Sequence, residues 1–420
     1  MSGWFAPPTE SKSIHARNVL MRVQFAACGV GLGHVGRCLP IAQGLRKNDN
    51  TQVFFSTYHD AVNYVRQEGF STFEIPAMSF KVKPDGAVDF RRTALSPGPF
   101  VAPFNFLKQV RREIQIMGTL KPNVVVSDSR ASAIIAAAML SIPNLCILNQ
   151  FQVIIPRKTH YLRLARFADA ATLAVIGKIW TAGAQVMIPD FPQPYTISWE
   201  NLHIPRMYER KTRLIGPILP VQSNALPTKE KLRKRLGLQE GKPLIFAPIS
   251  GPLKERAYFA KILRKILASL SDKYQVVMSL GYPESNGSFS RDGDFRVFKW
   301  IPNRFEYLKA SDVVISRAGH GTMLQTICYG KPAILVPTPS HTEQINNARR
   351  GVALGVAKIV EQDKLNKGAL LRAIRETMEN ERFLERVQEI QKDVCKWDGL
   401  EIAIGAIIHV AEGGKEFVSA

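Results

Sequence analysis

The chain has 420 residues, too many for one ordinary hydrophobic core, which predicts two or three domains. It carries 56 Lys and Arg against 35 Asp and Glu, and the net charge of +21 predicts an anionic partner such as a phosphorylated substrate, a lipid surface or a nucleic acid. The five cysteines are scattered and lack CxxC spacing, which argues against a disulfide framework or a cysteine zinc site and favours a cytoplasmic location.

Residues 1–17 are expected to form a mobile N-terminal extension. They also lack the apolar core of a cleavable signal. No uninterrupted apolar run reaches the roughly 18 residues that a membrane span needs. The nearest candidate, residues 168–188, is interrupted by Asp169 and Lys178. A peripheral membrane protein fits this pattern, and a spanning one does not.

Residues 18–215 are predicted to form a first domain in which strands alternate with helices. Apolar runs predict strands at 20–29, 51–57, 123–129, 144–151 and 184–191, with an extended segment at 71–76. Helices are expected after the Gly-rich turn that begins at residue 29, over 61–70 and over the Ala-rich stretch 131–140. Strands that are apolar throughout predict a parallel sheet covered on both faces.

Residues 216–390 are predicted to repeat this pattern as a second domain, after a Pro-containing linker over 215–228. Strands are expected at 243–250, 274–280, 295–301, 312–316 and 332–338, with helices over 257–270 and 322–330. Residues 391–420 are predicted to form a helical segment whose apolar part packs back on a domain. The predicted fold class is α/β, with two doubly wound Rossmann-like domains facing a central cleft.

An anion site is predicted at residues 316–322, where Gly, hydroxyl and basic side chains follow the strand 312–316 and open a helix. Such a turn points free backbone N–H groups and the positive end of the helix dipole at its ligand, and a diphosphate suits both. The alternative is an ordinary Gly-rich connection.

Two segments together carry a family resemblance: GVGLGHVGRCLPIA at residues 29–42 and SRAGHGTMLQTICYGKPAILVPTPSHTEQINNA at residues 316–348. They resemble the inverting GT-B glycosyltransferases, in particular the group that contains the UDP-glycosyltransferases and the lipid-linked N-acetylglucosaminyl transferase of peptidoglycan synthesis. The first segment also resembles an archaeal and bacterial branch of uncertain substrates. The resemblance implies an inverting transfer of a hexose or N-acetylhexosamine from a nucleotide sugar, with UDP expected, to a hydroxyl acceptor. Such an acceptor is frequently lipid-linked or part of the cell envelope.

The resemblance places the nucleotide sugar, a co-substrate and not a resident cofactor, on the second domain. By position, the diphosphate would contact Gly319, His320, Gly321 and Thr322, and Arg317 would supply a permanent cation where many relatives have a histidine. Trp300 matches the aromatic residue that stacks on the uracil ring. Its alternative role is that of a core tryptophan that closes a strand.

Glu343 and Gln344 match an acidic residue and a glutamine that bind the donor sugar hydroxyls, and their alternative is a solvated surface pair. Gln325 stands where relatives usually have a glutamate on the ribose, so the identity of the nucleotide is left open.

His34 corresponds to the catalytic base of the small-molecule members, and Asp128 to the carboxylate that orients it. The alternatives are a helix cap or packing role for His34 and an N-cap role for Asp128. Gly31 and Gly33 flank the acceptor-side loop. No DxD-like carboxylate pair stands at a suitable place, so transfer is predicted to need no metal.

The acceptor side includes two clusters of apolar and basic residues, at 97–117 and 154–167. Phe104 and Leu107 lie next to Lys108, Arg111 and Arg112, a composition that suits docking of a peripheral protein on the inner face of an anionic membrane. The alternative is that amphipathic helices of the acceptor cleft simply solvate their charges.

Three rival functions are weighed. A nucleic-acid-binding protein would explain the positive charge, but the basic residues are dispersed and no recognition motif is present, so no nucleic-acid partner is expected. A UDP-sugar epimerase of similar fold would convert donor without acceptor. A binding-only protein with a degenerate site is favoured by Gln325 alone.

Overall fold

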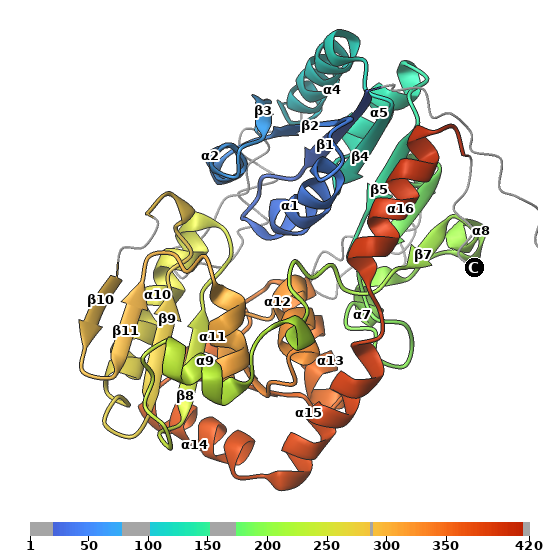
Figure 1. The fold of residues 1–420 in the computed structure, drawn as a ribbon. Coiled ribbons are helices and arrows are strands. Elements are labelled where there is room, and N and C mark those ends of the chain that lie inside the picture. Colours follow the sequence, from blue (N-terminus) through green and yellow to red (C-terminus); the bar gives the residue numbers. More distant parts are fainter. Residues whose placement is uncertain (1–19, 78–100, 152–173, 286–288, 415–420) are drawn as a thin grey trace, which may run out of the picture.

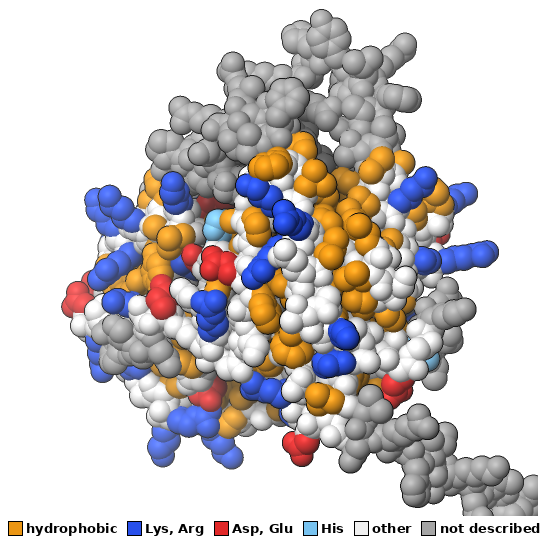
Figure 2. Space-filling model, turned by 90° about the horizontal axis from the view of Figure 1, so that it is seen from above, with side chains coloured by type: hydrophobic (Ala, Val, Ile, Leu, Met, Phe, Trp, Pro, Cys, Tyr) orange, Lys and Arg blue, Asp and Glu red, His pale blue; other side chains and the backbone are white. Residues whose placement is uncertain are grey.

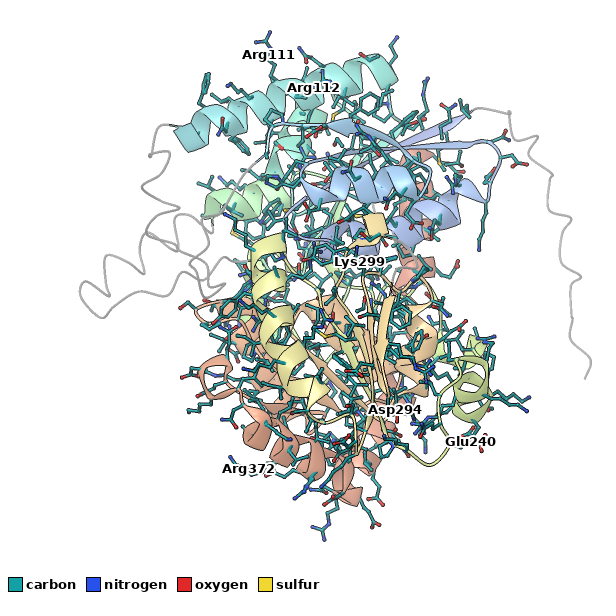
Figure 3. The ribbon with its side chains drawn as sticks, turned by 90° about the vertical axis from the view of Figure 1, so that its left-hand side faces the viewer. Arg111, Arg112, Glu240, Asp294, Lys299 and Arg372 are labelled. Carbon is teal, nitrogen blue, oxygen red and sulfur yellow. The ribbon has the colours of Figure 1, made fainter. Side chains whose placement is uncertain are left out.

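The computed structural model describes residues 20–77, 101–151, 174–285 and 289–414 (Figure 1). The predicted extension over residues 1–17 and the second acceptor-side cluster at 154–167 lie outside these ranges. Figures 1 and 3 show two layered domains, one above the other.

The first domain contains, within the described residues, a seven-stranded parallel sheet in the order β3-β2-β1-β4-β5-β6-β7. Its strands are β1 (Met21–Ala27), β2 (Thr51–Thr57), β3 (Ser71–Glu74), β4 (Val124–Asp128), β5 (Asn144–Ile147), β6 (Gln185–Ile188) and β7 (Thr212–Leu214). Its helices are α1 (Gly33–Arg46), α2 (Asp60–Gln67), α4 (Val101–Leu120), α5 (Ala131–Met139), α7 (Trp199–Leu202) and α8 (Arg206–Glu209).

The central strand β4 shows why the sheet is covered on both faces. All five of its residues are buried. Val124 and Val126 belong to the core cluster with α1, whereas Val125 packs with Met117 of α4 and Ala133 of α5 on the opposite face. The uninterrupted apolar run is therefore the signature of a strand buried between two helix layers, as predicted.

The second domain contains, in the described part of the chain, a sheet in the order β10-β11-β9-β8-β12-β13-β14, parallel except for β10. Its strands are β8 (Leu244–Pro248), β9 (Gln275–Ser279), β10 (Phe289–Asp292), β11 (Phe295–Phe298), β12 (Val313–Ser316), β13 (Ala333–Leu335) and β14 (Ala357–Ile359). Its helices are α9 (Lys229–Arg235), α10 (Leu253–Ala268), α11 (Arg304–Ala310), α12 (His320–Cys328), α13 (Thr342–Ala353), α14 (Lys367–Met378) and α15 (Glu381–Val394), with short 3-10 turns η1 (Ser223–Ala225), η2 (Pro283–Ser285) and η3 (Gln362–Lys364). The predicted fold class, two Rossmann-like domains of the GT-B type, is confirmed.

The chain crosses from one domain to the other more than once. The last helix, α16 (Gly399–Ala411), packs Ala403 and Ile407 into the core of the first domain. Conversely, Phe191 and Ile197 lie in the core of the second domain, although they precede the predicted border at residue 215. The predicted border at residue 391 falls inside α15. Both borders are therefore approximate, because a run of residues can leave one core and enter the other without a change in composition.

The sequence pattern missed the short strands β7, β10 and β14. They contain three or four residues each, include Arg213, Arg291 and Lys358, and lie at or near sheet edges. Edge strands need no long apolar run, so their signal is weak. No helix among the described residues is both long and apolar enough to cross a membrane.

Candidate active site

The first half of the site is built where β1 and β4 end beside the start of α1. Gly31 adopts φ +70°, a left-handed conformation that favours glycine, and the turn leads into α1 at Gly33. A methyl group added at Gly31 would lie 3.3 Å from the Gly251 carbonyl carbon. Since Gly251 belongs to the loop after β8, this turn brings the two domains into contact next to the site.

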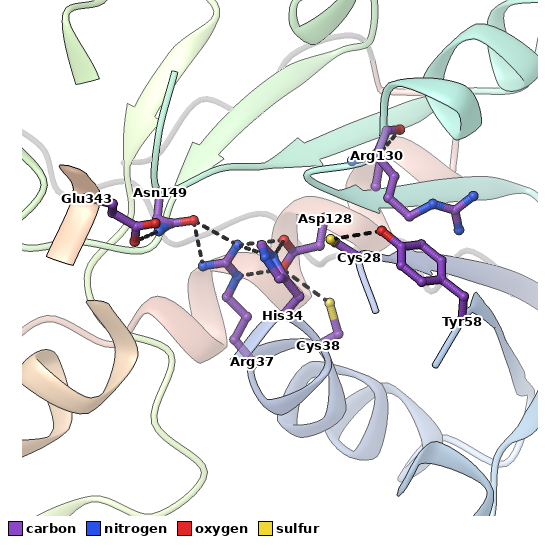
Figure 4. Close-up of polar contacts among 10 residues, drawn as sticks. Cys28, His34, Arg37, Cys38, Tyr58, Asp128, Arg130, Asn149 and Glu343 are labelled. Carbon is purple, nitrogen blue, oxygen red and sulfur yellow. Dashed lines mark hydrogen bonds and ion pairs between the residues drawn. The ribbon is translucent and has the colours of Figure 1, made fainter. Parts of the chain in front are cut away.

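His34 and Asp128 meet, as the sequence predicted (Figure 4). The Nδ1 atom of His34 lies 2.7 Å from Oδ1 of Asp128, and the histidine side chain keeps 24% of its surface exposed. Neither residue caps a helix: Leu32 occupies the cap position of α1 and Arg130 that of α5. The structure therefore removes the capping alternatives for both residues.

Arg37 is the third member of this group, and the sequence analysis did not assign it. Its Nε and Nη2 atoms each lie 2.5 Å from an oxygen of Asp128, which gives a bidentate ion pair. Arg37 follows His34 by three residues on α1, so both side chains lie on one helix face. That spacing is the signal from which Arg37 could have been found.

These contacts fix the tautomer of His34. Arg37 Nη2 lies 3.0 Å from Nδ1 of His34, but a guanidinium has no acceptor and cannot receive the imidazole proton. We therefore place a proton on Nδ1 of His34, which donates it in a hydrogen bond to the Asp128 carboxylate. Nε2 then carries no proton and can accept one from the substrate. Such an orienting carboxylate is the usual partner of a histidine base.

Asp128 is held as a carboxylate. The residue is fully buried, and burial alone would raise its pKa, but the charges and hydrogen bonds of Arg37 and His34 outweigh this and hold the pKa well below its usual range. Burial likewise lowers the pKa of Arg37, while the opposite charge of Asp128 raises it and prevails. At neutral pH the pair is fully ionised.

A hydrogen bond from Asn149 connects this group to the second domain. Asn149, just beyond β5, donates from Nδ2 to Oε1 of Glu343 at 2.7 Å, and its Oδ1 lies 3.2 Å from both Nη atoms of Arg37. Glu343 stands in the first turn of α13. A residue predicted to bind the donor sugar thus lies one side chain away from the predicted base machinery.

The second half of the site is the start of α12. Gly319 is the cap residue, and no side chain caps the helix there. A methyl group added at Gly319 or at Gly321 would meet no described atom within 4 Å. The first N–H groups of α12, those of residues 320–322, have no intrahelical acceptor. An anion at this position would be stabilised by the N–H groups and the helix dipole.

The side chain of His320 is directed toward the segment after β6, so any contact of His320 with the diphosphate would come from its backbone N–H. It is 4% exposed, and its Nε2 lies 3.0 Å from Oδ2 of Asp190 in the segment after β6. Its backbone N–H remains at the helix start.

Arg317 is also directed away from the predicted phosphate. Its guanidinium lies 3.9 Å from the centre of the Phe259 ring, and it donates to the Val336 carbonyl at 2.9 Å and to Gln362 at 2.6 Å. Burial lowers its pKa to about 10, so it stays charged at neutral pH. In this arrangement Arg317 packs against Phe259 of α10. These contacts do not favour the predicted direct contact of Arg317 with a phosphate.

The remaining predicted donor residues surround the start of α12 and α13. Gln344 is buried and accepts the Thr338 N–H at 3.0 Å, so it braces the loop after β13. Trp300 is half-buried and meets the edge of Tyr64 from α2, with ring centroids 5.4 Å apart. Gln325 lies on α12, partly exposed. Their ligand roles remain predictions.

Comparison with known proteins shows similarity to glycosyltransferases. Residues 255–396 match the glycosyltransferase family 28 C-terminal domain. The chain is 27% identical to an uncharacterized glycosyltransferase of Methanosarcina mazei over 94% of its own length and 100% of the relative's. It is 26% identical to the UDP-N-acetylglucosamine–N-acetylmuramyl-(pentapeptide) pyrophosphoryl-undecaprenol N-acetylglucosamine transferase of Lactococcus lactis, over 90% of this chain and 95% of that one.

Solved structures give the fold independently. The calicheamicin glycosyltransferase CalG4 superimposes with a TM-score of 0.62 at 17% identity, covering 94% of this chain and 99% of that chain. The structural match shows the GT-B fold. Together with it, the family 28 domain and the full-length relatives support a GT-B glycosyltransferase related to the lipid-linked N-acetylglucosaminyl transferases.

Proposed function

We propose that this glycosyltransferase moves a hexose or N-acetylhexosamine from a nucleotide-diphosphate sugar, with UDP favoured, to a hydroxyl group and inverts the anomeric centre. The observation that carries the proposal is the contact of His34 with Asp128 in the first domain, together with the open start of α12 in the second. One half of the cleft offers a base, and the other offers a site for an anionic leaving group.

The transfer follows from these positions. Nε2 of His34 takes the acceptor hydroxyl proton as the acceptor oxygen bonds to the anomeric carbon, and the bond from that carbon to the diphosphate oxygen breaks. The negative charge that develops on the diphosphate is stabilised by the N–H groups at residues 320–322 and by the helix dipole. We propose that these groups suffice without a metal. Activity lost to a chelator and restored by magnesium or manganese would contradict this.

The test is a transfer assay with purified protein. A thermal-shift panel of nucleotide sugars first identifies the donor, since a ligand of the folded state raises the unfolding temperature. The expected result is a product of inverted configuration with a hydroxyl acceptor. Conversion of the donor sugar in the absence of any acceptor would instead indicate the epimerase.

The base-binding role of Trp300 gives a separate prediction. Trp300→Ala is expected to weaken binding of the whole nucleotide sugar about tenfold, because stacking of a base on an aromatic ring contributes about 1–3 kcal/mol. Binding of a sugar phosphate without the base should not change. Trp199→Ala, on the 46% exposed Trp199 of α7, is the control. Equal affinity of Trp300→Ala and the parent for the nucleotide sugar would refute stacking.

We further propose that α4 docks the protein on the inner face of an anionic membrane and that the acceptor is lipid-linked. Phe104 and Leu107 are 57% and 63% exposed, and Lys108 lies over the Phe104 ring at 4.4 Å. Figure 3 shows Arg111 and Arg112 pointing away from the body of the protein, and Figure 2 shows apolar and basic side chains intermixed on this face. Apolar side chains beside cations suit the lipid headgroup boundary.

Arg111→Ala with Arg112→Ala should lower vesicle binding about 10- to 30-fold, at about 1 kcal/mol for each basic residue near the surface. Flotation with vesicles of phosphatidylserine and phosphatidylcholine at low salt measures this. The matched control replaces the exposed Arg372 and Arg375 on α14, at the opposite end of the molecule in Figure 3. A parent protein that does not float would refute membrane docking.

A further inference from the structure

A continuous series of polar contacts crosses the cleft from Glu343 to His34. Glu343 accepts from Asn149 at 2.7 Å, Asn149 accepts from Arg37 at 3.2 Å, Arg37 binds Asp128 at 2.5 Å, and Asp128 binds His34 at 2.7 Å (Figure 4). The residues come from α13, from the loop after β5, from α1 and from β4. The series therefore joins both domains at the site itself.

The orientation of Asn149 in this series is fixed by chemistry. Its neighbours are a guanidinium, which can only donate, and a carboxylate, which can only accept, so the amide oxygen must face Arg37 and the amide nitrogen must face Glu343. Asn149 is 8% exposed and cannot exchange either partner for bulk water without moving. Asn149 therefore hydrogen-bonds a cation and an anion at the same time.

Glu343 retains capacity for a second ligand. Asn149 occupies Oε1, and among the described residues no hydrogen bond to Oε2 is present. A donor sugar hydroxyl can therefore bind Glu343 while Asn149 still holds it. Arg37 in turn uses Nε and Nη2 on Asp128, and Nη1 and Nη2 on Asn149. A shift of Glu343 would therefore be passed through the Asn149 amide and the Arg37 guanidinium to the carboxylate that orients His34.

We propose that Arg37 and Asn149 are positioning residues that couple the donor-sugar carboxylate Glu343 to the base His34, so that the base is aligned while Glu343 holds the donor sugar. The inference rests on the proposed function for the roles of His34 and Glu343. The interdomain coupling itself belongs to the donor-free protein and can be measured there.

The first experiment is a polarity swap followed by thermal unfolding without donor. Asn149→Asp places two carboxylates 2.7 Å apart and should lower the unfolding midpoint by several degrees. Adding Glu343→Gln supplies an amide donor opposite the carboxylate introduced at position 149, and the other oxygen of that carboxylate still accepts from Arg37. The double variant should recover at least half of the lost unfolding midpoint. The control is Asn303→Asp, since the Asn303 amide likewise donates to a carboxylate, that of Glu306 at 2.9 Å, but within one helix start at the surface. It should change the midpoint little.

The second experiment separates the inference from the proposed function. In the transfer assay, Asn149→Ala should lower kcat by about 10- to 100-fold through misalignment of the base and change the donor dissociation constant by less than about threefold. If the double variant recovers the unfolding midpoint and the parent transfers sugar, both the coupling and the proposed function are supported. If the midpoint recovers but the parent shows no transfer, the proposed function is refuted and the interdomain contact stands. No restoration, or a kcat of Asn149→Ala equal to that of the parent, overturns the coupling.

Discussion

Replacing His34 by alanine should lower kcat by about 10²- to 10⁴-fold, the contribution usual for a positioned general base. The expectation follows from the short contact of Nδ1 with Asp128, which leaves Nε2 free to take the acceptor proton. His34 stands on α1, whereas the proposed phosphate site is the start of α12, so the donor dissociation constant should stay within about twofold. Single-turnover transfer and donor thermal shifts measure the two quantities.

Two control variants make this test specific. His34→Gln keeps a group that can hydrogen-bond Asp128 but has no basic nitrogen, so it should be nearly as inactive as His34→Ala. His203→Ala removes a histidine that is 54% exposed and lies 4.0 Å from Glu200, and it should behave as the parent. Transfer by His34→Ala at more than about a tenth of the parental rate would show that another group, or water, takes the proton.

The family resemblance predicted the pair His34 and Asp128, and the sheet explains why they meet, since both lie at or beyond the ends of parallel strands. The carboxyl ends of such strands meet at one edge of the sheet, so the turn after β1 and the end of β4 had to lie close together. Asn149 follows β5, the neighbour of β4, and meets the same rule. It was missed because an asparagine after a strand is common. What distinguishes it is its contact with Glu343, 194 residues away in the chain, which no local pattern contains.

The direction of Arg317 could have been predicted from the alternation of side chains along β12. Val313 and Ile315 pack in the core cluster with Phe259 of α10, and Val314 packs on the opposite face with α12. Arg317 continues the series of odd residues, so its side chain points toward α10 and stacks on Phe259. The motif placed Arg317 in the loop, whereas the alternation of the strand decides where the side chain goes.

The orientation of His320 has a different cause, and it leads to the second large effect. Asp190 is fully buried, and its two oxygens accept from the N–H groups of Phe191, Ile197 and Ser198, from the Ser198 hydroxyl and from His320. One carboxylate thus organises the segment after β6 and ties it to the first residue of α12. A histidine can form this contact only after the domains assemble, so the sequence near His320 gives no sign of it.

Asp190→Ala should therefore destabilise the protein by about 3–5 kcal/mol, because it leaves a buried imidazole and several buried N–H groups without an acceptor. The unfolding midpoint in urea and in thermal scans measures the loss. The matched control is Asp398→Ala, which removes a carboxylate that accepts from the N–H groups of Leu400 and Glu401 at the more exposed start of α16. A helix cap of this kind contributes about 1 kcal/mol.

The difference in unfolding midpoint between Asp190→Ala and the parent should also depend on pH and become smaller in acid. Burial raises the pKa of Asp190, but His320 and the hydrogen bonds of Ser198 prevail and lower it below its value in the unfolded chain. A depressed folded-state pKa contributes stability that is fully present above the unfolded value of about 4 and is lost as the pH falls through the folded value. The gap in unfolding midpoint between the two proteins should therefore narrow as the pH falls below about 4. A gap that stayed constant into the acid range would mean that the carboxylate charge of Asp190 contributes nothing, and that the loss comes from packing alone.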